Sequence, residues 1–179
     1  MQRRTAVQYL FVVAAGSALL PSCLFKNDQP SIALKHLDIS AEQERLLAEI
    51  AETIIPSGAT PGAKDTYAHL FALRMMDDCY ISQKQKVFVT GLMQVEDIAK
   101  KKFGSSFQKC TVDDRNEIVS MLETNKTPRE AVDFYNMMKH LVTQGYLSSK
   151  PVLGNIFKYE LVPGRYNGAY PVKTIVHQA

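Results

Sequence analysis

Apolar residues recur at helical spacing in five separate segments of this chain, and Pro, Gly and polar residues lie between them. Spacing of three and four residues places the apolar side chains on one stripe of a helix, which must be buried against other helices. With 179 residues, 46% of them hydrophobic, the chain is long enough for one packed domain and short for two. These features predict an all-α fold, a compact bundle of about five helices. The predicted helices span residues 40–54, 65–79, 82–103, 111–122 and 127–145.

Capping signals indicate where these helices begin. Ser40 can accept a hydrogen bond from the N–H of Gln43, whose side chain can reach back to Ser40. Thr111 stands at the corresponding place before the fourth helix. The clearest start is Thr127 followed by Pro128, with threonine expected as the cap and proline at the first helical position. Pro56, Gly104 and Gly145 are expected to end helices.

The apolar stripes define the predicted core, and the opposite faces are expected to be solvated. On the first helix, Glu42, Arg45, Glu49 and Glu52 face away from the stripe. The pair Asp77 and Asp78 is likewise expected in solvent rather than in acid catalysis. The predicted core residues are Leu46, Leu47, Ile50, Ile54, Tyr67, Phe71, Met75, Phe88, Leu92, Val95, Ala99, Phe103, Ile118, Met121, Leu122, Phe134, Met138 and Leu141.

From Lys150 onward the chain is rich in Pro, Gly and aromatic residues, which predicts extended backbone and turns. This C-terminal extension either wraps over the bundle or presents an aromatic surface to a partner, and aromatic rings with polar tips suit both arrangements. The candidate partner surface comprises Phe157, Tyr159, Tyr166 and Tyr170.

The N-terminus has the features of an export signal. Arg3 and Arg4 precede an uncharged apolar run at residues 9–20. That run is about a dozen residues long, whereas a membrane-spanning helix needs roughly 20. The paired arginines indicate the twin-arginine route, which carries folded proteins, and a general secretory signal is the alternative. We expect residues 1–22 to form this signal peptide.

Cys23 follows Leu20-Pro21-Ser22, a segment that resembles a bacterial lipobox. The prediction is that Cys23 becomes the acylated first residue of a periplasmic lipoprotein, attached to the membrane through its acyl chains. An ordinary cysteine near the cleavage site is the alternative. Residues 23–38 would then be a lipid-anchored tether, irregular over residues 24–35, and residues 39–179 the helical domain.

Charge and motifs argue against several functions. Residues 1–22 hold two of the 21 basic and none of the 18 acidic residues, so the remainder is nearly neutral and nucleic acid is not an expected partner. The chain has no G-x-G-x-x-G or C-x-x-C-H motif, and its four histidines are far apart in sequence. We therefore expect no catalytic, cofactor-binding or metal-binding residue in this chain.

Two cysteines remain besides Cys23. Export would place Cys79 and Cys110 in an oxidising compartment, where they could form a disulfide. Two buried thiols are the alternative, and sequence spacing does not decide between them.

The order of several short segments resembles the gluconate 2-dehydrogenase subunit 3 family, the small or gamma subunit of a membrane-associated flavoprotein dehydrogenase. The resemblance covers about residues 40–170. Its segments are Ala51-Glu52-Thr53-Ile54-Ile55-Pro56, Thr60-Pro61-Gly62-Ala63, Asp78-Cys79-Tyr80, Phe88, Gly91-Leu92, Phe103-Gly104, Phe107, Thr143-Gln144-Gly145-Tyr146-Leu147-Ser148-Ser149, Tyr159 and Pro163-Gly164-Arg165-Tyr166-Asn167-Gly168.

This resemblance implies an accessory role. In such complexes a large flavoprotein subunit of the glucose-methanol-choline type carries FAD and oxidises the sugar, and a cytochrome c subunit accepts the electrons where one is present. The small subunit is expected to help the large one mature, to supply its twin-arginine signal and to hold it at the membrane. The substrate does not follow from the resemblance. A stand-alone lipid-anchored binding or scaffold protein is the first alternative, and an enzyme is the second.

Overall fold

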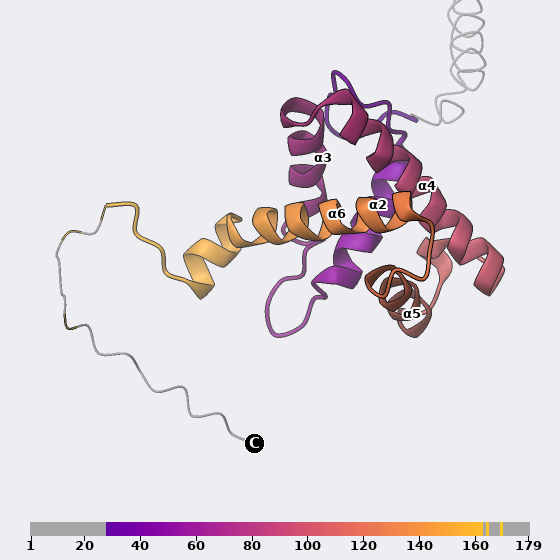
Figure 1. The fold of residues 1–179 in the computed structure, drawn as a ribbon. Coiled ribbons are helices and arrows are strands. Elements are labelled where there is room, and N and C mark those ends of the chain that lie inside the picture. Colours follow the sequence, from indigo (N-terminus) through magenta and orange to yellow (C-terminus); the bar gives the residue numbers. More distant parts are fainter. Residues whose placement is uncertain (1–27, 163, 165–168, 170–179) are drawn as a thin grey trace, which may run out of the picture.

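The computed structural model describes residues 28–162, 164 and 169, and within them the chain is all-α, as predicted (Figure 1). The described residues contain no strand and no helix that is both long and apolar enough to cross a membrane. The elements are α2 (Ala41–Ile54), α3 (Ala68–Cys79), α4 (Ser82–Phe103), the 3-10 turn η1 (Phe107–Lys109), α5 (Val112–Glu123), α6 (Arg129–Leu147) and the π turn η2 (Val152–Ile156).

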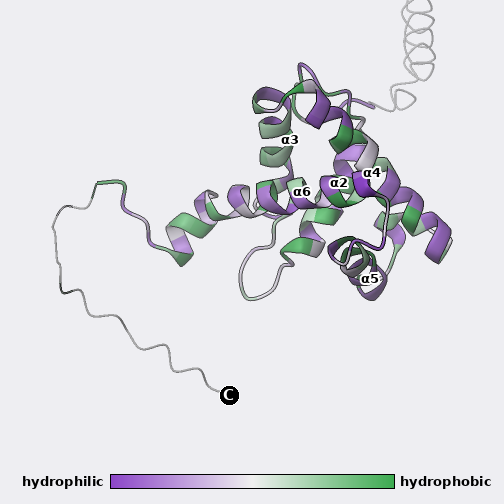
Figure 2. Cartoon of the chain, viewed as in Figure 1, coloured by the Kyte–Doolittle hydropathy of each residue, from purple (hydrophilic) through white to green (hydrophobic). Residues whose placement is uncertain are grey.

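Helix α6 organises the bundle. It lies across α2, α3 and α4 in Figure 1 and also contacts α5. Its most extensive contacts are with α4 and α3. Every helix carries both hydrophilic and hydrophobic residues (Figure 2), and the hydrophobic stripes meet in a single core. Phe88 of α4 meets Phe134 of α6 edge to face, with ring centroids 4.9 Å apart. The predicted stripes of the first, third, fourth and fifth helices are confirmed.

The capping predictions are confirmed for two helices and wrong for one. Ser40 and Thr111 each form a complete capping box, with Gln43 and Asp114 respectively. In α6 the cap is Pro128 rather than Thr127, because the backbone of Pro128 is extended (ψ 144°) and its carbonyl accepts the first helical hydrogen bonds. The hydroxyl of Thr127 caps nothing, and it is buried without a hydrogen-bond partner among the described residues.

The predicted stripe of α3 is also wrong. Tyr67 lies outside the helix in a left-handed conformation (φ 55°) and is 66% exposed. The buried positions are instead Ala68, His69, Ala72, Leu73, Met76 and Asp77. Leu73 and Met76 supply the large apolar groups of this face, and the small alanine side chains let α3 approach its neighbours closely, while Phe71 and Met75 are only partly buried.

The segment before α2 belongs to the folded body over residues 28–39, and this differs from the prediction of a free tether. Leu37 and Ile39 are buried in the core. The carbonyl of Asp28 accepts the N–H of Ala41 at 3.0 Å, and the side chain of Glu44 accepts both the N–H and the hydroxyl of Ser31. Residues 28–39 are therefore part of the folded body in this structure.

Candidate functional site

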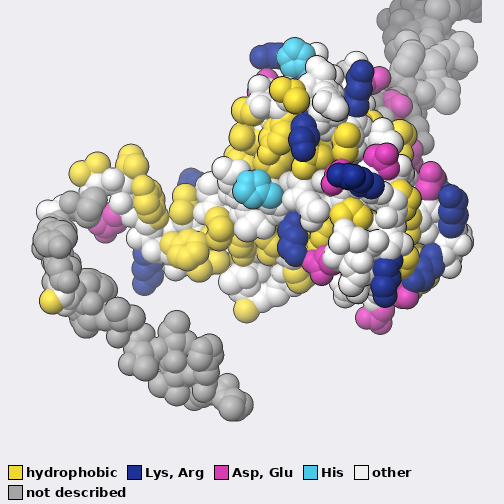
Figure 3. Space-filling model, viewed as in Figure 1, with side chains coloured by type: hydrophobic (Ala, Val, Ile, Leu, Met, Phe, Trp, Pro, Cys, Tyr) yellow, Lys and Arg dark blue, Asp and Glu magenta, His cyan; other side chains and the backbone are white. Residues whose placement is uncertain are grey.

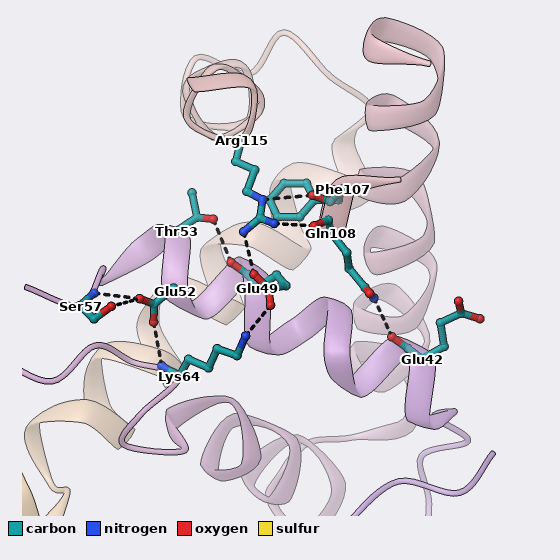
Figure 4. Close-up of polar contacts among 9 residues, drawn as sticks. All are labelled: Glu42, Glu49, Glu52, Thr53, Ser57, Lys64, Phe107, Gln108 and Arg115. Atoms are coloured by element: carbon teal, nitrogen blue, oxygen red, sulfur yellow. Dashed lines mark hydrogen bonds and ion pairs between the residues drawn. The ribbon is translucent and has the colours of Figure 1, made fainter. Parts of the chain in front are cut away.

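The loop between α2 and α3 is organised by the carboxylate of Glu52 (Figure 4). One oxygen of Glu52 accepts the N–H and the hydroxyl of Ser57, at 2.8 and 2.6 Å, and the other accepts the N–H of Lys64 at 3.2 Å. A Cβ at Gly62 would lie 2.6 Å from Glu52 Oε2, so this position has no room for a side chain. The loop encloses the carboxylate with backbone groups, and this explains why glycine stands at residue 62.

Glu49, one turn earlier on α2, connects the loop to the far side of the bundle. Lys64 Nζ donates to one of its carboxylate oxygens at 2.6 Å, and Arg115 Nη1 of α5 donates to the other at 2.7 Å. Arg115 also donates to the carbonyl of Phe107 at 3.1 Å and to that of Gln108 at 2.6 Å (Figure 4). One guanidinium thus joins α2, η1 and α5.

We refer to Glu49, Glu52, Lys64 and Arg115 as the polar cluster. Partial burial raises the pKa of both carboxyl groups, but the hydrogen bonds and the positive charge of Lys64 outweigh it, so each pKa is lowered. Arg115 acts on Glu49 in the same direction. The cluster contains two carboxylates and two cations, and each carboxylate oxygen already accepts at least one hydrogen bond from within the chain. The cluster is suited to holding loops together. Glu49 and Glu52 face away from the apolar stripe of α2, as predicted, and the loop and α5 leave them half-buried.

Asp77 is the most completely buried acid in the described chain, although the sequence interpretation placed it in solvent. Its side chain is 1% exposed and accepts three backbone N–H groups, from Lys35 at 2.8 Å, His36 at 2.7 Å and Leu37 at 2.8 Å. Burial raises the pKa of Asp77, and these three hydrogen bonds outweigh it, so the net pKa is lowered. Asp77 therefore holds the N-terminal segment on α3. One signal for this role was available, because an acid in the last turn of a helix opposes the helix dipole.

Replacing Asp77 by alanine should lower the free energy of unfolding by about 3 kcal/mol, since three buried N–H groups lose their acceptor. Asp78→Ala is the matched control. Asp78 is the exposed neighbour, its nearest cations are 3.7 and 3.9 Å away, and its loss should cost less than about 0.5 kcal/mol. Urea unfolding measures both values, and amide exchange at residues 35–37 should accelerate only in the Asp77 variant. Equal losses in the two variants would contradict this role.

His69 of α3 is a buried titratable group without a full set of partners. It is 6% exposed, and its Nδ1 has no hydrogen-bond partner among the described residues. Burial lowers the pKa of His69 further than the negative charge of Glu44 raises it, and Lys64 adds to the lowering. Groups of three or more potential metal ligands are absent from the part of the chain that the structure describes, so His69 is not part of a metal site there.

The lowered pKa of His69 predicts a loss of stability in mild acid. The neutral form is favoured in the folded state, so its contribution is present above the unfolded pKa of about 6.5 and declines as pH falls from there towards the folded pKa. Urea unfolding between pH 7.5 and 5 should show this decline in the wild type and in His140→Gln, a control at an exposed histidine. It should be weaker in His69→Gln. An unchanged pH profile in His69→Gln would assign the decline to other groups.

The cysteines considered for a disulfide are both free thiols in this structure. Cys79, at the end of α3, is exposed, and Cys110, after η1, is buried. Burial raises the pKa of Cys110, and the negative charge of Asp114 raises it further. Its thiol is held in the protonated, unreactive form.

The predicted partner surface lies partly within the described chain. Phe157 and Tyr159 are 58% and 59% exposed, and the segment that carries them extends away from the bundle rather than over it (Figures 1 and 3). Tyr166 and Tyr170 lie outside the described residues, as do Arg3, Arg4 and Cys23. Leu161 and Val162, which the sequence interpretation did not select, are the most exposed large apolar residues described, each at 82%.

A groove on the described surface lies between the start of α2, the second half of α4 and η1, with a volume of about 760 Å³. Leu46, Leu92 and Met93 supply its apolar part. Its rim combines acids with lysines, and Glu96 on this rim already pairs with Lys100 at 3.3 Å and accepts the N–H of Phe107 at 3.0 Å. The groove therefore carries both positive and negative side chains, and at least one of its acids is already paired within the chain.

Comparison with known proteins gives one finding. A family model described as gluconate 2-dehydrogenase subunit 3 matches residues 41–164, which include every described helix. No curated protein and no solved structure matches the chain.

Proposed function

Because the chain belongs to the gluconate 2-dehydrogenase subunit 3 family, we propose that it is the non-catalytic small subunit of a membrane-associated, FAD-dependent dehydrogenase complex. In this proposal the catalytic partner is a flavoprotein of the glucose-methanol-choline type, which holds the FAD. The small subunit helps this partner to mature, takes it through the twin-arginine route and keeps it at the membrane. The observation that carries the proposal is the family match over the whole helical body.

The fold supports the export part of the proposal. The twin-arginine route carries proteins that have already folded. An all-α domain can fold before export, because most of its backbone hydrogen bonds form within its helices and two of these helices begin with complete capping boxes. Arg3 and Arg4 supply the address in this proposal, and Cys23 supplies the acyl anchor on the periplasmic side of the membrane.

The test is co-expression with the flavoprotein encoded beside this chain. The expected result is a complex with one copy of each subunit, in which flavin absorbance comes with the large subunit and not with this chain alone. A cytochrome c subunit in the same complex would be seen by its haem absorbance. If this chain does not bind the flavoprotein, the proposal is wrong, and the stand-alone scaffold becomes the better explanation.

Two variants test the export signal and the acyl anchor separately. Replacing Arg3 and Arg4 by lysine should keep both subunits in the cytoplasm, and unchanged export of both would argue against the twin-arginine route. Replacing Cys23 by alanine should abolish labelling with radioactive palmitate and release the complex from membranes. Equal labelling of the variant and the wild type would overturn the anchor.

A further inference from the structure

Exposed apolar side chains gather at one end of the molecule. Ten large apolar residues are exposed in the described chain, and six of them lie within residues 147–162, which we call the C-terminal arm. Figure 3 shows hydrophobic side chains along the part of the molecule that projects from the bundle. A well-packed monomer rarely concentrates apolar surface in this way unless something covers it. The six residues are Leu147, Ile156, Phe157, Tyr159, Leu161 and Val162.

The base of the arm is fixed to the bundle. Val152 is 1% exposed, and the N–H of Leu153 donates to the carbonyl of Ser149 at 2.9 Å. Further along, the N–H of Phe157 donates to the carbonyl of Val152 at 3.0 Å, and that of Tyr159 to the carbonyl of Leu153 at 2.9 Å. These bonds order the backbone of the arm as far as Tyr159, so less conformational entropy is lost when a partner covers Ile156, Phe157 and Tyr159.

We propose that the C-terminal arm is the segment that docks on the catalytic flavoprotein, in an apolar groove of that subunit. This inference rests on the proposed function, which supplies the partner. Three properties of the arm and of the surface around it favour this occupant over a membrane or a second copy of the chain.

The first property is the backbone of the arm. Among the described residues, the N–H groups of residues 160–162 have no backbone acceptor. Unpaired backbone groups are costly to place in hydrocarbon, where they find no hydrogen-bond partner. A protein groove can pair with an extended segment through its own carbonyl and N–H groups while pockets take up the side chains. The extended part of the arm therefore suits a protein better than a bilayer.

The second property is the charge that lines two grooves of the described surface. Glu96, Asp97 and Lys100 line one of about 760 Å³, and Lys35 and Lys86 line another of about 530 Å³. An apolar segment placed in either groove would take these charges out of water without giving them partners. These two grooves are therefore poor receptors for the arm of a second copy.

The third property is the position of the arm. Residues 28–39 enter the bundle beside α2 and α3, whereas the arm leaves from the end of α6 on another side (Figure 1). A chain held at the membrane through its N-terminal segment thus keeps the arm free for a second protein. One bundle can serve both attachments at once.

The test uses the full chain co-expressed with the flavoprotein. The arm variant is Leu161→Ser with Val162→Ser. The matched control is Ile81→Ser with Val112→Ser, at positions that are 68% and 71% exposed on the bundle. The arm variant is expected to bind the flavoprotein at least tenfold more weakly than the wild type, and the control should bind within twofold of it. Urea unfolding of the arm variant should match that of the wild type, because neither side chain lies in the core. The control should be at least as stable, because serine at the N-cap position of α4 can accept a hydrogen bond from the start of the helix.

The possible outcomes separate the explanations. If the wild type binds the flavoprotein and the arm variant binds equally well, the arm is not the docking segment, while the proposed function stands. If the wild type does not bind, both proposals are overturned. Loss of binding to phosphatidylglycerol vesicles with unchanged flavoprotein binding would assign the arm to the membrane. Loss of a concentration-dependent dimer in gel filtration, again with unchanged flavoprotein binding, would assign it to a second copy.

Discussion

Gly91→Ala is expected to lower the free energy of unfolding by about 3 kcal/mol, because α4 and α6 touch at this residue. A Cβ at Gly91 would lie 2.3 Å from the Cβ of Phe134 and 2.4 Å from the carbonyl oxygen of Glu130. Both are far inside van der Waals contact, and one of them is backbone. The two helices must move apart, and this separation breaks the ring contact between Phe88 and Phe134. Thermal unfolding should show a fall in Tm of about 10 °C.

Gly58→Ala is the control for this prediction. Gly58 lies in the loop after α2, and nothing lies within 4 Å of a Cβ built there. Its conversion to alanine should be neutral or slightly stabilising, since alanine restricts the unfolded chain more than glycine does. If the two variants unfold at the same temperature, α4 and α6 do not pack through Gly91. Because the twin-arginine route requires a folded protein, Gly91→Ala should also reduce export of the flavoprotein if the proposed function holds.

Arg115→Ala is expected to lower the free energy of unfolding by about 3 kcal/mol. Its side chain is only 15% exposed, and its removal leaves the carbonyl of Gln108 without a donor and takes one donor each from the carbonyl of Phe107 and the carboxylate of Glu49, which keep Cys110 N–H and Lys64. The contact between α2 and η1 should loosen as a result. Chemical denaturation measures the loss, and amide exchange should report faster opening around η1.

Arg129→Ala is the control for Arg115. Arg129 is 91% exposed and lies 3.9 Å from Asp133, so its loss should cost less than about 0.5 kcal/mol. A double-mutant cycle with Glu49→Gln isolates the pair, and the double variant should lose at least about 1 kcal/mol less than the sum of the single losses. Strictly additive losses would show that the two side chains do not interact in solution.

Local features were predictable from the sequence. The capping boxes at Ser40 and Thr111 and the end of α4 at Gly104 follow from residues within one helical turn of each other. Four of the five apolar stripes were predicted correctly for the same reason, because helical periodicity is a property of neighbouring residues. The predicted stripe of α3 failed because the buried face mixes Leu73 and Met76 with small and polar residues, whose burial depends on what packs against them.

The polar contacts were not predictable in the same way. Asp77 meets residues about 40 positions earlier, and Arg115 meets a carboxylate 66 positions away. An acid on a polar helix face looks the same in sequence whether it points into water or into a loop that returns from elsewhere. Whether such an acid is buried depends on the position of the backbone N–H groups of the other segment in the folded chain. A local sequence pattern does not determine that position.

By itself, the sequence determined the helices, some of their boundaries and most of the core, because these depend on interactions between residues a few positions apart. It also carried the family resemblance that the comparison confirmed. Only the tertiary structure decided that residues 28–39 are held by Asp77, that Glu49 and Arg115 clamp α2 to η1, and that the arm stands away from the bundle. Each of these depends on the meeting of segments far apart in the chain, and their geometry is set by the packing of the whole bundle.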